Sequence, residues 1–120
     1  MSGWEAMRRG ELETAAVEFS RAVALAPQGP LAGDATFWHA VTIARVGRSA
    51  EAVAALRGFV ATYPTSARVG EASAMLGWML VDAHELEEAR RRFQAAVNDP
   101  QPSVQASGRQ GLELLDKPAR

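Results

Sequence analysis

The chain has no cysteine among its 120 residues. Disulfide bonds and thiol chemistry are therefore excluded, and the absence fits any redox compartment. Aromatic residues make up only 7% of the sequence, and no segment has the richness in Val, Ile and Thr that strands require. Long apolar runs are absent too. A charged residue interrupts each within about ten positions, whereas a bilayer-spanning helix needs about 20, so no direct membrane insertion is expected.

Neither sign of charge dominates the chain, whose formal net charge is −1. Such a chain attracts no polyanion over long range, so a nucleic-acid partner is not expected. The first basic residues, Arg8 and Arg9, are followed by Glu11 and Glu13 rather than by the apolar stretch of a secretory signal. An export signal or membrane anchor outside this segment stays open.

What the sequence does contain is a repeat with a period of 37 residues. The recurring positions are Gly10, Gly47 and His84; Ala15, Ala52 and Ala89; Phe19, Leu56 and Phe93; Ala22, Phe59 and Ala96; and Pro27, Pro64 and, one place early, Pro100. A fixed period of this length is typical of a helical solenoid, in which each two-helix repeat is too small to bury its own apolar face and packs on the next. Such arrays usually present a surface to a partner.

The spacing of apolar residues predicts an all-α fold, because they recur three and four positions apart. Gly and Pro punctuation divides the chain into helices at about 3–9, 11–26, 31–46, 49–62, 66–83, 85–98 and 103–116. Ser49 and Ser66 are expected to be N-caps, and Pro100 and Pro102 to end the sixth helix. Paired helices should approach most closely at Ala15, Ala52 and Ala89, where a side chain is only a methyl group.

The segment 10–27 resembles the second helix of a tetratricopeptide repeat. That family has a small residue before this helix, then an Ala, an aromatic, a second Ala and a closing Pro. These places hold Gly10, Ala15, Phe19, Ala22 and Pro27. The resemblance implies a single domain, 1–120, that forms a superhelix of antiparallel helical hairpins. Its repeats would span about 3–27, 31–64 and 66–100, with a C-terminal capping helix at about 103–116.

Two departures from that pattern stand out. The usual period is about 34 residues, so each repeat here is longer. His84 stands where Gly10 and Gly47 end the first helices of the preceding hairpins. A left-handed backbone is uncommon for a residue other than Gly, but His tolerates it.

The resemblance implies a non-catalytic scaffold module that binds another protein or peptide. In such arrays the first helix of each hairpin lines an apolar concave groove, which would contain Trp4, Phe37, Val41, Arg45, Trp78 and Val81. Trp and Phe are good anchors for a partner's helix or extended peptide. For Trp4 and Trp78, packing in the core is the competing interpretation. Trp38 faces another way and is expected in the core.

Some members of the family clamp a C-terminal carboxylate with Lys, Asn and Arg side chains. The corresponding positions here hold Phe37, Val41, Glu71 and Met75, so that class of partner is not expected.

No constellation in the sequence predicts catalysis, a metal site or a cofactor. The two histidines stand far apart, and neither belongs to a metal-binding motif. His39 is expected to be a partly buried packing residue and His84 a turn residue. Gly108 and Gly111 follow no strand, so they do not form a phosphate-binding loop. The chain is therefore not expected to be an enzyme.

The alternative is a structural repeat segment of a larger protein that self-associates as a homo-oligomer, since a short first hairpin leaves apolar surface uncovered. The segment 63–72, with Tyr63-Pro64, Ser66 and Glu71-Ala72, resembles the longer repeats of bacterial envelope scaffolds such as outer-membrane assembly lipoproteins. Membrane-anchored regulators of the anti-sigma type carry similar modules. This resemblance suggests the bacterial cell envelope or periplasm. The cytoplasm stays open, as do the partner's identity, the oligomeric state and the full number of repeats.

Overall fold

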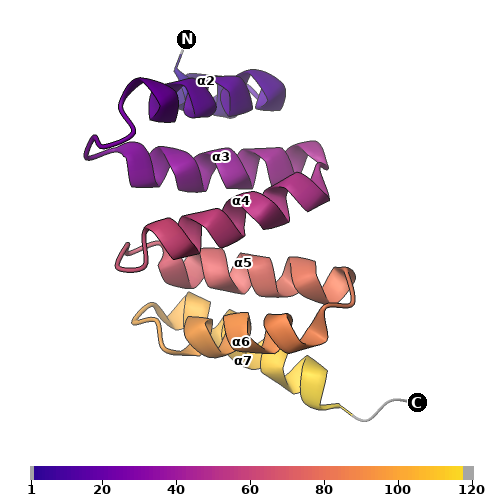
Figure 1. Cartoon of the computed structure of the whole chain (residues 1–120). Helices are drawn as coiled ribbons and strands as arrows, with labels where there is room; N and C mark the ends of the chain where they lie inside the picture. The colour runs from indigo at the N-terminus through magenta and orange to yellow at the C-terminus, as the bar shows by residue number, and fades with distance from the viewer. Residues whose placement is uncertain (1, 118–120) are drawn as a thin grey trace. The chain divides into compact units, whose positions relative to one another are not determined.

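The computed structural model describes residues 2–117, and over that range it contains seven α-helices and no strand (Figure 1). The helices are α1 (Gly3–Arg8), α2 (Leu12–Leu25), α3 (Ala32–Val46), α4 (Ser49–Thr62), α5 (Val69–Asp82), α6 (Leu86–Val97) and α7 (Pro102–Asp116). The predicted all-α fold of helical hairpins is confirmed, and it is of the solenoid class. Within the described residues, no helix is both long and apolar enough to span a membrane.

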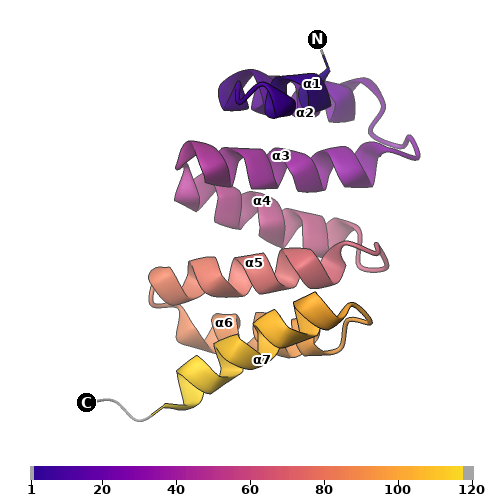
Figure 2. The ribbon, with the colours of Figure 1, turned by 180° about the vertical axis from the view of Figure 1, so that it is seen from behind.

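The chain divides into two compact units, Met1–Ser66 and Ala67–Arg120. In the N-terminal unit, α1 packs on α2, α2 on α3, and α3 on α4. In the C-terminal unit, α7 packs on both α5 and α6, and Figure 2 shows it lying across α6. The expectation of one undivided domain stays a prediction.

The small residues of the repeat lie where they were expected. Ala15, Ala52 and Ala89 are all fully buried. Ala15 belongs to a cluster with Ala6 and Phe19 that joins α1 to α2. A buried methyl group lets two helix backbones approach closely, and the larger neighbour fills the remaining space.

Three helix ends turn through the left-handed region of the backbone. Gly10, Gly47 and His84 have φ angles of 76°, 100° and 61°. The N–H of each following residue donates to the carbonyl five positions earlier, as Arg48 does to Ile43 at 3.1 Å. This capping pattern satisfies helix-end carbonyls. The prediction that His84 takes the place of the helix-ending Gly is confirmed.

Three predictions about the residues at helix ends are wrong, although the predicted bounds 49–62 agree with α4. Ser49 is the first residue of α4 rather than its cap, because Arg48 occupies the N-cap position. Ser66 closes a turn through its N–H bond to the carbonyl of Tyr63 at 3.1 Å, so α5 begins only at Val69. Pro102 begins α7 and does not end α6. The first helical position needs no N–H, so Pro fits there.

Candidate functional site

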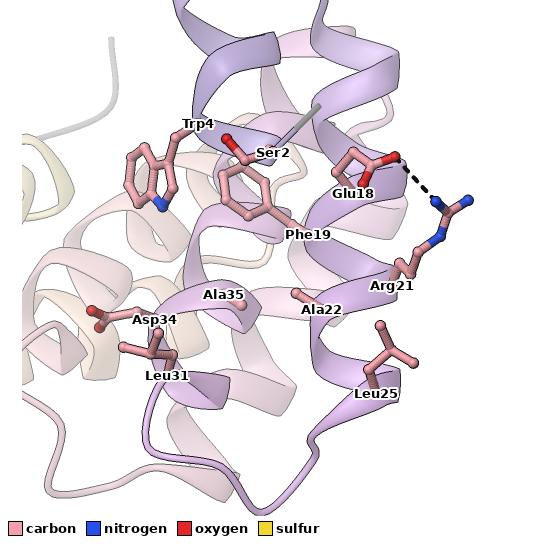
Figure 3. A pocket seen from close by; sticks show the side chains of 11 residues that line it. Ser2, Trp4, Glu18, Phe19, Arg21, Ala22, Leu25, Leu31, Asp34 and Ala35 are labelled. Carbon is pink, nitrogen blue, oxygen red and sulfur yellow. Dashed lines mark hydrogen bonds and ion pairs between the residues drawn. The ribbon is translucent and has the colours of Figure 1, made fainter.

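A hollow of about 350 Å³ opens in the N-terminal unit between α1, the second half of α2 and the start of α3 (Figure 3). Trp4 and Phe19 line one side of it, and Ala22, Leu25 and Leu31 line the other. Three of these side chains are well exposed for large apolar groups: Trp4 by 46%, Leu25 by 79% and Leu31 by 73%. Soluble monomers rarely leave apolar side chains gathered in this way unless the surface binds something.

The hollow exists because α1 is short. Ser2 caps this helix, with its hydroxyl accepting the N–H of Glu5 at 3.1 Å. Gly3 then lies so close to Phe19 that a Cβ atom would stand 2.8 Å from its ring. The helix therefore covers α2 as far as Phe19, while Ala22 and Leu25 beyond it stay exposed.

The rim of the hollow carries charge of both signs. Arg21 forms an ion pair with Glu18 at 3.4 Å, drawn in Figure 3, and Asp34 adds a second carboxylate from the first turn of α3. The last turn of α2 contains no basic residue that would offset the negative end of the helix dipole. The site thus combines an apolar floor with a mildly acidic rim.

A row of aromatic rings leads from the hollow into the core of the N-terminal unit. Trp4 packs edge-on against Trp38 with ring centroids 4.8 Å apart, and Trp38 packs against Phe37 at 5.3 Å. Phe37 in turn contacts Phe59 at 5.5 Å. Trp38, which the sequence analysis assigned to the core, is half-buried.

The other predicted groove residues of this unit differ in how much surface they offer. Phe37 and Val41 are only 3% and 7% exposed, so a partner would find little of either side chain. Phe37 is buried because rings on both sides contact it. Arg45, in the last turn of α3, is exposed.

In the C-terminal unit, Trp78 is half-buried and held on two sides. Its ring packs against Phe93 with centroids 5.0 Å apart, and its indole N–H donates to the hydroxyl of Ser107 at 2.9 Å. Val81, one turn further along α5, is also half-buried. Trp78 thus has a structural role and still exposes part of its ring.

Sequence reasoning missed Leu25 and Leu31, although a signal was present. One repeat later these positions hold Thr62 and Arg68, which are polar. When a position is apolar in the first repeat and polar in the second, it indicates an apolar surface that only the first repeat has.

The histidines offer no catalytic arrangement. His39 is half-buried, as expected, beside a shallower hollow that Glu13 and Arg48 also line. Burial lowers the pKa of His39 below its ordinary value of 6.5; Glu51 opposes this shift and Arg48 reinforces it. Between residues 2 and 117, no group of three His, Asp or Glu side chains could hold a metal ion.

Antiparallel hairpins repeated along the chain and closed by a further helix, with large apolar side chains left exposed, define a helical-repeat protein. The model of one family, the tetratricopeptide repeat, matches residues 1–67. The chain belongs to that family. Its repeats generally mediate protein–protein interaction or scaffolding and are typically non-catalytic. None of the curated proteins compared with this chain matches it.

Proposed function

We propose that this chain is an interaction module that binds a peptide or helix of another protein through the first helices of its hairpins, which are α1 and α3 in the N-terminal unit and α5 in the C-terminal unit. The observation that carries the proposal is Trp4. A tryptophan 46% exposed, whose ring rests on Trp38, is a preorganised anchor in a family that binds proteins.

The other candidate binding residues differ in how directly a partner would contact them. Phe37 and Val41 give an apolar floor, and Arg45 supplies a charge for orienting a partner. In the C-terminal unit, Trp78 and Val81 offer a partly exposed surface of their own. Residues of this kind suit an amphipathic helix or an extended peptide.

The test starts from a displayed peptide library selected on the immobilised chain. Affinities of the recovered peptides are then measured by calorimetry against wild type, Trp4→Ala and Arg45→Glu. We expect Trp4→Ala to weaken binding by about tenfold or more, as for an interface hot spot. Leu114→Ala, at an exposed position of α7, is the control and should bind like wild type. Failure to recover any saturable ligand would contradict the proposal.

The alternative is self-association, which the exposure of Leu25 and Leu31 favours. Light scattering over a wide concentration range separates the two functions. A strict monomer counts against self-association, whereas a concentration-dependent mass that Leu25→Glu abolishes supports it.

A further inference from the structure

We propose that the hollow beside Trp4 receives two turns of an amphipathic helix from another polypeptide. The inner face of that helix would present a small residue and, four positions later, an aromatic one, and its outer flank would be basic. This inference rests on the proposed function and extends it to a second surface. That surface lies on α2 beyond the N-terminal end of α1.

A comparison of the three repeats shows which part of α2 is uncovered. Ala22, Phe59 and Ala96 occupy the same repeat position, and Phe59 and Ala96 are fully buried whereas Ala22 is exposed. The next turn of the same helices shows the same difference in burial. Tyr63 and Asp99, each before a proline, are half-buried, but their equivalent Ala26 is exposed.

The second repeat shows what normally covers this surface. A Cβ atom on Gly33 of α3 would lie 3.4 Å from the ring of Tyr63, and the ring of Phe37 packs on Phe59. A glycine and an aromatic four residues later thus face the second half of α4.

In the third repeat a glycine of the first helix again faces the end of the second helix, and the residue four positions later is a smaller apolar one. Gly70 of α5 lies against Asp99, and Ala74 clusters with Ala96 and Val104. A small residue followed four positions later by an apolar one is therefore the side-chain pattern that this surface accepts. Since Ala22 is smaller than Phe59, the place opposite it has room for a large ring.

The missing cover amounts to about two helical turns. α1 has six residues and α5 has 14, a difference of eight, or about two turns at 3.6 residues per turn. Among the described residues α1 does not supply these turns, because Ser2 is in an extended conformation and caps the helix at Gly3.

Charge sets the direction and polarity of the occupant. A helix that replaces the missing turns runs antiparallel to α2, so its positive N-terminal end meets the negative C-terminal end of α2. Glu18 and Asp34 outnumber Arg21 on the rim. Lysine or arginine on the outer flank of the occupant would complement them.

The probe is a labelled peptide that copies residues 29–40 of this chain and carries Asp34→Lys. It keeps Gly33 and Phe37, and a side-chain staple holds it helical, since a peptide of this length is marginal as a free helix. Binding to the full chain is measured by fluorescence polarisation. We expect saturable binding, and a tenfold or greater loss, by order of magnitude, when Phe37 of the peptide is replaced by Ala.

Two variants of the protein locate the site. Leu25→Glu places a charge in the hollow and should weaken binding by about tenfold or more, while the melting curve stays unchanged because Leu25 is largely solvated. Ala22→Phe recreates the side chain of Phe59 and fills the hollow, so it should also block the peptide. Leu114→Glu, on α7 of the other unit, is the matched control and should bind normally.

Three results would overturn the inference. One is no saturable binding at peptide concentrations up to about 1 mM, which corresponds to negligible affinity. Another is binding that neither Leu25→Glu nor Ala22→Phe weakens. The third is sedimentation showing dimers that Leu25→Glu dissolves, which would make a second copy the occupant. If the stapled peptide fails but library peptides still bind and respond to Arg45→Glu, only this inference falls and the proposed function stands.

Discussion

Replacing Gly111 by alanine should detach or strain the capping helix. A Cβ atom at Gly111 would collide with the ring of Phe93, which is fully buried. That ring cannot move away freely, because Gly77 on α5 already approaches it so closely that a Cβ there would stand 2.7 Å away. Phe93 is therefore held between two helices that come near only because both lack a side chain at the contact.

The expected magnitude follows from two opposing effects. Overpacking of a well-packed core costs about 1–3 kcal/mol, and the trapped ring puts Gly111→Ala near the upper end. Alanine in place of glycine within a helix returns about 1 kcal/mol through its higher helix propensity. The net loss in the free energy of unfolding should be about 2 kcal/mol, or about 8 °C in Tm for a chain of this size.

Gly58→Ala isolates the propensity effect. Gly58 is an exposed position within α4, and a Cβ atom there would meet nothing within 4 Å. This variant should gain about 0.5–1 kcal/mol. Thermal unfolding followed by circular dichroism compares the two with wild type. Equal shifts of the same sign in both variants would refute the assignment of Gly111 as a close-contact residue.

The remaining predictions concern three other contacts. Ala89→Leu should cost about 1–3 kcal/mol by forcing α6 away from its neighbours, and an unchanged denaturant midpoint would contradict the burial of Ala89. Ser107→Ala should cost about 0.5–1.5 kcal/mol by leaving the indole N–H of Trp78 without its acceptor, and should alter the near-ultraviolet signal of that ring. Burial lowers the pKa of His39, so the unfolded chain takes up this proton first as the pH falls. Its contribution to stability is complete above pH 6.5, the ordinary value, and is lost as the pH falls through the pKa of the folded state. His39→Gln should therefore flatten the pH dependence of unfolding as the pH falls below 6.5, and an identical slope would disprove it.

Much of the architecture can be read from the sequence by itself. The 37-residue period, the order of the helices, the buried Ala15 and Ala89, and the left-handed turn at His84 all follow from it. These features depend on neighbours along the chain or on a regular spacing, and both are visible in one dimension. A helix-ending position that two other repeats fill with glycine, and an alanine that recurs at a fixed interval, can both be interpreted from the sequence.

Only the tertiary structure decided which side chains the helices trap and which they leave uncovered. Nothing in the sequence marks Gly111 as the point where α7 packs on Phe93, and the hydrogen-bond partner of Trp78 is Ser107, 29 residues further along the chain. The exposure of Leu25 likewise depends on where α1 begins over α2. Such contacts join residues of different helices, and their distances are set by how the helix backbones approach one another, which no spacing in the sequence records.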